Sequence, residues 1–126
     1  IFADTEVWDA TRGAAVHLDS IRLATTGISQ GQASELKGGT AELNARIARD
    51  VFAGKTDGPL QAVRDAVALN TAAALVAWDA ANGRGSDEAI TERVIAAMPR
   101  ALEAINSGAV LRLLDRWAAV SSDAAR

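Results

Sequence analysis

The feature that most constrains the fold is a long helical segment that contains almost no polar residues. Between Ala66 and Trp78 the only polar side chains are Asn70 and Thr71, so the segment offers no face suited to water. A helix that is apolar on every side belongs inside a larger body of protein. The segment is too short and too rich in alanine to span a bilayer, so we expect it to pack against other protein elements.

Residues that commonly begin and end helices mark the bounds of this one. Pro59 suits the first turn, where a missing backbone N–H costs nothing, and Gly83 lies just beyond the last apolar residues. We therefore predict a helix over residues 59–80. Its alanines would allow other helices or a sheet to approach closely.

A shorter helix is predicted over residues 40–53. Its apolar residues Leu43, Ile47 and Val51 recur every four positions, which indicates one buried face. Thr40 is the expected N-cap, because its hydroxyl can accept a hydrogen bond from the first turn.

A third helix is predicted over residues 87–105. Ser86 is the expected N-cap, with Asp87 and Glu88 in the first turn, where the helix dipole favours acidic groups. The apolar stripe stays in phase across Pro99, so we expect one helix kinked at this proline.

The final predicted helix covers residues 109–120, and residues 121–126 are expected to fray. Its stripe consists of Val110, Leu113, Leu114, Trp117 and Val120.

The N-terminal part predicts a β-hairpin over residues 6–23, with a turn at Arg12-Gly13. A two-stranded hairpin is marginal by itself, so it should lean on other elements. Residues 25–39 are rich in Gly, Ser, Thr and Gln and form a predicted linker with at most one helical turn over residues 33–36. The glycine spacing of the linker fits neither a dinucleotide fold nor a P-loop. The whole chain, residues 1–126, is expected to form one domain or part of one.

Composition excludes several classes of function. The formal net charge of -3 and the pI near 5.1 provide no basic field for nucleic acid or an anionic membrane. The absence of cysteine and the single histidine argue against disulfides, thiolate metal sites and imidazole-rich metal sites. These features fit a soluble protein of the reducing cytoplasm. Because Ile1 is not a methionine, we expect the chain to begin inside a longer reading frame.

Two pairs of ionisable side chains in the N-terminal part could in principle belong to a site. His17 and Asp19 lie two residues apart on one face, which could orient an imidazole, but no nucleophile completes the set. We expect His17 to be a surface or strand-packing residue. Asp4 and Glu6 also share a face, but without a third ligand they are expected to be solvated charges.

The charged residues of the helices are expected to be structural. Arg46 and Asp50 are spaced for an i,i+4 pair beside Arg49 on a solvent face. Arg64 and Asp65 are expected to form an ion pair or a contact at the start of the apolar helix.

Two asparagines and the tryptophans are expected to hold the fold together. Asn44 and Asn70 need hydrogen-bond partners on otherwise apolar helix faces, so each is expected to tie its helix to a neighbouring loop or strand end. Trp8, Trp78 and Trp117 lack interleaved basic residues, and core anchoring is expected.

Residues 38–78 contain a series of short motifs in a definite order. They are Gly38-Gly39, Asn44-Ala45, Gly58-Pro59, Arg64-Asp65, Leu69-Asn70 and the run from Ala72 to Leu75. This order resembles the C-terminal region of anthranilate phosphoribosyltransferases. The hairpin sequence "TEVWDATRGAAVH" and the closing "AINSGAVLRLLDRW" extend the resemblance over nearly the whole chain, about the last third of such an enzyme.

The resemblance implies the C-terminal part of an α/β catalytic domain of the nucleoside phosphorylase/phosphoribosyltransferase type, here mostly α with a short β-hairpin. It implies transfer of phosphoribosyl from phosphoribosyl pyrophosphate to anthranilate in tryptophan biosynthesis, by a magnesium-dependent, cytoplasmic homodimer. The missing N-terminal portion of the same protein would be this chain's partner, and the apolar helix would lie against the central sheet.

The chain departs from the family pattern in lacking its working parts. The Gly-Thr-Gly-Gly-Asp loop, the Lys-His-Gly-Asn segment, the anthranilate-binding arginine and the adjacent Asp-Glu pair for magnesium do not occur. Asp4 and Glu6 are separated by Thr5 and do not inherit the metal role, and Thr40 stands where an acidic residue is usual. We therefore assign no catalytic, substrate-binding or metal-binding residue to this chain and expect it to be inactive scaffold alone. Two alternatives remain, a fragment related to pyrimidine nucleoside phosphorylases and a helical interaction module without enzymatic activity.

Overall fold

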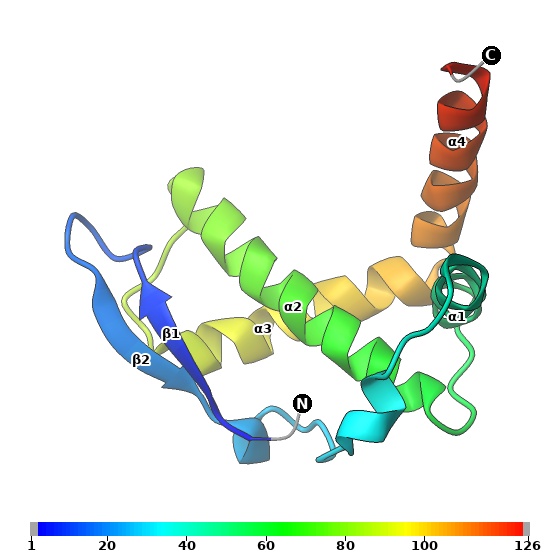
Figure 1. The fold of residues 1–126 in the computed structure, drawn as a ribbon. Helices are drawn as coiled ribbons and strands as arrows, with labels where there is room; N and C mark the ends of the chain where they lie inside the picture. Colours follow the sequence, from blue (N-terminus) through cyan, green and yellow to red (C-terminus); the bar gives the residue numbers. More distant parts are fainter. Residues whose placement is uncertain (1–2, 125–126) are drawn as a thin grey trace.

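The computed structural model describes residues 3–124, which form an antiparallel β-hairpin followed by α-helices (Figure 1). The mostly helical fold with a short hairpin is therefore confirmed. The strands are β1 (Thr5–Asp9) and β2 (His17–Ile21), and the helices are α1 (Ala41–Phe52), α2 (Leu60–Ala81), α3 (Ile90–Asn106) and α4 (Ala109–Ala124).

The connection between the hairpin and α1 contains two short 3₁₀ turns, Leu23–Thr25 and Ala33–Leu36. The second coincides with the single turn predicted in the linker. At the start of α1, the Thr40 hydroxyl accepts a hydrogen bond from the backbone N–H of Leu43 at 3.3 Å, as expected for an N-cap.

The core lies where α2 crosses α3, with the hairpin against the N-terminal part of α3 (Figure 1). Ala68 and Ala72 are fully buried on the inner face of α2, and their small side chains let α3 approach closely. Opposite them, Val94 of α3 is also fully buried. Ile21 of β2 joins the same apolar cluster, which gives the hairpin the support that two strands need.

Only one stripe of α2 is fully buried within the described residues. Its buried positions recur every four residues, at Ala68, Ala72 and Val76. Ala74 and Trp78 on other faces are exposed. The helix that is apolar all round therefore retains an apolar face without a partner in residues 3–124.

The predicted N-cap of α3 is wrong. The helix begins at Ile90, so Asp87 and Glu88 precede its first turn, and the Ser86 hydroxyl donates to Glu88 instead, at 3.2 Å. The start of α3 is capped by a residue distant in sequence, because the Asp19 carboxylate of β2 accepts a hydrogen bond from the backbone N–H of Ile90 at 3.2 Å. The helix then continues through Pro99 as one element.

The predicted end of α4 is also wrong. The helix continues from residue 120 to Ala124, and the Ser122 hydroxyl donates to the Ala118 carbonyl at 2.8 Å within this last turn. The remainder of the stretch expected to fray, residues 125–126, lies outside the described residues. Figure 1 shows α4 projecting away from the crossed helices.

No single helix in the described part of the chain is long and apolar enough to cross a membrane. By length and composition only, α3 and α4 pass that test together as a pair bent by 61°. Much of α3 is buried in the core of this fold.

Candidate functional site

The densest group of polar side chains joins the hairpin to α3. Asp9, at the end of β1, has a side chain only 1% exposed, and it forms an ion pair with Arg93 of α3, which is 5% exposed. The same carboxylate accepts hydrogen bonds from the Thr11 backbone N–H at 2.9 Å and from Arg12 Nε at 3.1 Å. We call Asp9, Thr11, Arg12, Asp19 and Arg93 the hairpin–α3 junction.

Burial alone would raise the pKa of Asp9, but the hydrogen bonds from Thr11 and Arg93 outweigh it and lower this pKa to about 2. The carboxylate is therefore ionised at neutral pH and already occupied by donors. A group held in this way stabilises the packing of two elements and is poorly suited to accept a proton from a substrate.

Asp19 and Thr91 complete the attachment of the hairpin. Backbone hydrogen bonds from Ser20 and Ile90 lower the pKa of Asp19, and Arg12 lies 3.5 Å from its carboxylate. The Thr91 hydroxyl donates to the Ser20 carbonyl at 2.7 Å and accepts from the Arg22 backbone N–H at 3.1 Å. Side chains of α3 thus satisfy backbone groups at the end of β2.

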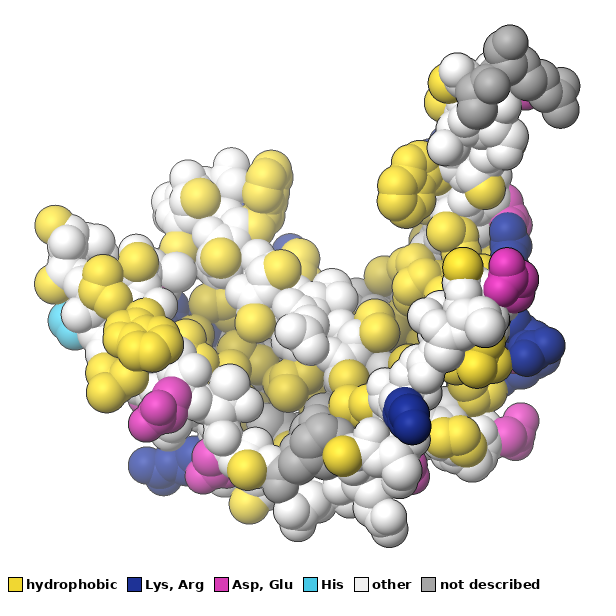
Figure 2. Space-filling model, in the orientation of Figure 1, with side chains coloured by type: hydrophobic (Ala, Val, Ile, Leu, Met, Phe, Trp, Pro, Cys, Tyr) yellow, Lys and Arg dark blue, Asp and Glu magenta, His cyan; other side chains and the backbone are white. Residues whose placement is uncertain are grey.

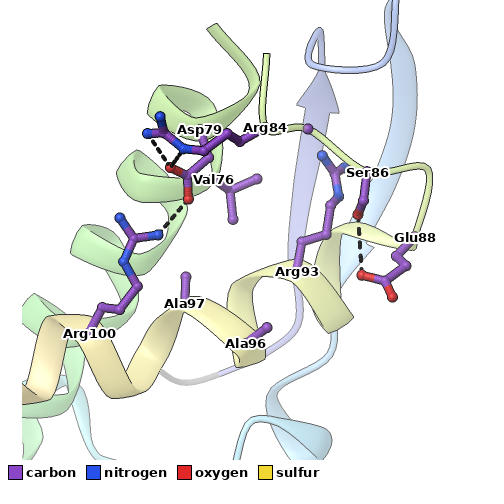
Figure 3. A pocket seen from close by; sticks show the side chains of 10 residues that line it. Val76, Asp79, Arg84, Ser86, Glu88, Arg93, Ala96, Ala97 and Arg100 are labelled. Carbon is purple, nitrogen blue, oxygen red and sulfur yellow. Dashed lines mark hydrogen bonds and ion pairs between the residues drawn. The ribbon is translucent and has the colours of Figure 1, made fainter. Parts of the chain in front are cut away.

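A second polar group lines a pocket of about 170 Å³ between the end of α2, the following loop and α3 (Figure 3). Asp79 accepts hydrogen bonds from Arg84 at 2.9 and 3.1 Å and pairs with Arg100. The hydrogen bonds from these arginines, with Arg100 the larger cause, hold the pKa of Asp79 below its ordinary value. The pocket therefore contains a carboxylate that two cations already neutralise.

The structure separates His17 from the acidic residues near it in sequence. His17 is exposed at the start of β2, as expected for a surface residue, while Asp19 bonds to Arg12 and α3. Asp4 and Glu6 are both exposed, as expected for solvated charges, and the Asp4 carboxylate also accepts a hydrogen bond from the Leu23 backbone N–H at 2.9 Å.

The predicted pair of Arg46 with Asp50 is wrong. Asp50 instead forms an ion pair with Lys55 at 2.6 Å, because the turn after α1 brings the lysine back to the end of the helix. Arg49 forms an ion pair with Asp115 of α4.

Arg64 and Asp65, which were expected to form an ion pair or a contact at the start of α2, each bond to a different residue. Arg64 donates to Asn106 at the end of α3 at 2.8 Å. Asp65 accepts from Gln61 one turn earlier, at 2.7 Å.

Asn44 makes the expected bond to a neighbouring loop. Its amide donates to the Gly39 carbonyl at 3.2 Å and accepts from the Gly39 N–H at 2.9 Å. A Cβ on Gly38 would lie 2.7 Å from the Asn44 side-chain oxygen, and one on Gly39 would lie 2.8 Å from Leu43. The Gly-Gly step and the asparagine therefore form one structural unit that fixes the start of α1.

The expectations for Asn70 and the tryptophans are wrong. Asn70 is exposed and donates to the Ala66 carbonyl of its own helix at 2.8 Å. Trp8, Trp78 and Trp117 are 73%, 61% and 71% exposed, because no described element covers the faces on which they lie.

Sequence reasoning missed the buried pair of Asp9 and Arg93. One signal was available: Arg93 lies three residues after Ile90 and one before Val94, within the buried stripe of α3. A charged residue at such a position needs a buried partner of opposite charge.

Magnesium does not fit the described residues. Within residues 3–124 no three His, Cys, Asp or Glu side chains gather as a metal site requires, and the carboxylates of Asp9 and Asp79 are paired with arginines. No step involving a metal ion follows from this part of the protein.

The sequence of the chain matches the model of a known protein family over most of its length. The model described as "Glycosyl transferase family, a/b domain" matches residues 1–111. The chain belongs to this family. Its similarity to the family includes the hairpin, the hairpin–α3 junction and the Gly-Gly step before α1, and ends near the start of α4.

Several curated relatives of this chain are named anthranilate phosphoribosyltransferase. The chain is 44% identical over 94% of its length to an anthranilate phosphoribosyltransferase of Nocardia farcinica, and 41% identical over 87% to one of Nocardioides sp.. An anthranilate phosphoribosyltransferase of Saccharopolyspora erythraea is 43% identical over 95% of the chain. The match spans 33%, 30% and 31% of these relatives, so the chain corresponds to about a third of their length. No solved structure matches the chain.

Proposed function

We propose that this chain is the C-terminal third of an anthranilate phosphoribosyltransferase. The complete enzyme would transfer phosphoribosyl from phosphoribosyl pyrophosphate to anthranilate in tryptophan biosynthesis. The observation that carries the proposal is 44% identity over 94% of the chain to the relative from Nocardia farcinica. The names of the relatives favour neither a nucleoside phosphorylase fragment nor a free-standing interaction module.

The role proposed for these residues is scaffold. The hairpin–α3 junction and the Asp79 cluster use their carboxylates to bind arginines, and Asn44 holds the Gly38-Gly39 step against α1. Such contacts position elements, and they leave the carboxylates of Asp9 and Asp79 paired with arginines. Substrate and pyrophosphate contacts are therefore proposed for the rest of the polypeptide.

The remaining properties of the whole protein are proposals from the family resemblance. They are an α/β domain of the nucleoside phosphorylase/phosphoribosyltransferase type, a magnesium ion held outside this chain, a homodimeric state and a cytoplasmic location. The acidic pI near 5.1 and the absence of cysteine agree with the last of these.

A chimera tests the proposed function. These 126 residues would replace the matching stretch of the Nocardia farcinica relative, and anthranilate consumption with phosphoribosyl pyrophosphate and magnesium would be measured. We expect the chimera to be active and the 126-residue chain alone to match a control without protein, with or without magnesium. A folded chimera without activity, or an active isolated chain, would contradict the proposal.

A further inference from the structure

The hairpin presents a free strand edge. Among the described residues β1 pairs with β2 alone, in a register that places Thr5 opposite Ile21 and Asp9 opposite His17. In an antiparallel pair, alternate residues direct their backbone N–H and C=O groups away from the partner strand. The outer edge of β1 therefore carries backbone groups that a further strand could bind.

An apolar groove lies beside this edge. It has a volume of about 310 Å³ and is formed by the inner face of the hairpin, the second 3₁₀ turn and one flank of α2. From β1 it takes Thr5 and Val7, and from α2 it takes Ala66, Leu69, Asn70 and Ala73. Figure 2 shows hydrophobic side chains on this face of the molecule, over the hairpin and along α2.

The opposite face of the hairpin carries an apolar pair beside Glu6 and Ser20. Trp8 and Leu18 face each other across the two strands, and they are 73% and 66% exposed. Val7 and Ile21 lie on the inner face, against the core. Strands with apolar side chains on both faces are typical of a sheet that is covered on both sides.

The length of the relatives identifies the occupant of the edge. The family is described as an a/b domain, yet the described residues supply a sheet of only two strands, and the chain corresponds to about a third of each relative compared. We infer that a strand from the remaining two thirds of the same polypeptide pairs with the free edge of β1 and packs its side chains into the groove on α2. This inference rests on the proposed function only in taking the chain to be part of a longer protein.

Hydrogen exchange at single-residue resolution on the chimera tests the inference. A two-stranded hairpin protects alternate amides of Thr5–Asp9, whereas a strand with neighbours on both sides protects them all. We expect the outward-facing amides of β1 to exchange at least about a hundredfold more slowly than unstructured amides. Fast exchange at alternate positions in an active chimera would overturn the inference and leave the proposed function standing.

A matched pair of variants locates the contact. Asn70 and Thr71 are both exposed, and each side chain bonds to a carbonyl four residues earlier in α2, but only Asn70 lines the groove. In the chimera, Asn70→Glu should speed exchange of the outward amides of β1 at least tenfold, and Thr71→Glu should leave it within about twofold. Equal effects of the two variants would contradict the inference.

Two other outcomes would also contradict the inferred pairing of β1 with a strand from the rest of the polypeptide. Protection of the outward amides that appears in the isolated chain and grows with its concentration would assign the edge to a second copy. A chimera that fails to unfold cooperatively would show that the remaining two thirds of the polypeptide do not complete this sheet.

Discussion

Helices α3 and α4 carry similar apolar stripes, but one stripe is buried and the other is exposed. On α3, Val94 is fully buried and Ile105 is 3% exposed, because both pack within this chain. On α4, Leu113, Trp117 and Val120 are 56%, 71% and 67% exposed. The difference teaches that a stripe predicts burial of a helix face without identifying the element that buries it.

Similarity to at least one relative extends along α4. The family match ends at residue 111, two residues after α4 begins, but similarity to the anthranilate phosphoribosyltransferase of Thermobifida fusca covers 122 residues. We expect the partner of the α4 stripe to lie in the part of the protein outside this chain.

The largest effect is expected for Arg93→Ala. It leaves the buried Asp9 carboxylate without its cation and should cost about 3–5 kcal/mol of unfolding free energy. The control is Arg116→Ala on the exposed face of α4, expected to change this free energy by less than about 0.5 kcal/mol. Urea denaturation of the chain measures both, and equal losses would contradict the contrast.

A pH titration addresses the same junction. Folding lowers the pKa of Asp9 from 3.8 to about 2. The ionised carboxylate therefore contributes fully to the free energy of unfolding above about pH 4, and this contribution is lost as the pH falls toward 2. The lowered pKa corresponds to about 2 kcal/mol of unfolding free energy. Asp9→Asn should remove this part of the acid dependence, as measured by urea denaturation between pH 2 and 7. An unchanged acid dependence in the variant would count against the role of Asp9.

Two valine truncations compare the stripes directly. Val94→Ala removes fully buried methyl groups and leaves a cavity, for a loss of about 2 kcal/mol in unfolding free energy. Val120→Ala removes the same atoms from an exposed site and should change it by less than about 0.5 kcal/mol. If Val120→Ala were as costly, the α4 stripe would be buried in the isolated chain.

The smallest effect on stability is expected for Trp117→Ser. The side chain is exposed, so the free energy of unfolding should change by less than about 0.5 kcal/mol. Self-association of the isolated chain should nevertheless weaken, because an apolar contact surface is lost. Sedimentation velocity over a concentration series measures this change, and the matched control is Ser121→Ala, which leaves the apolar stripe intact.

Local sequence signals predicted most of the elements. The four-residue repeat and Thr40 placed α1, Pro59 placed α2 within one residue of its start, and the Gly-rich composition placed the linker with its single turn. Each of these signals acts through neighbours within one or two helical turns, so the sequence alone contains the necessary information.

Contacts between distant residues were not predictable in the same way. The cap of α3 comes from Asp19, 71 positions away from Ile90, and the ion pair of the junction joins residues 84 positions apart. The tryptophans were expected in the core because they lack interleaved basic residues, but burial also needs a covering element. For the described residues of this chain, that element is missing around Trp8, Trp78 and Trp117.

The most direct measurement compares the chain alone with the chain mixed with the remaining two thirds of the Nocardia farcinica relative, by sedimentation and thermal melting. Exposed apolar surfaces on the hairpin, α2 and α4 should make the isolated chain self-associate. On mixing, we expect a one-to-one complex with a higher melting temperature, because a partner that binds the folded form stabilises it. A sharply melting monomer that the remaining portion leaves unchanged would contradict the conclusion that these surfaces belong inside a larger protein.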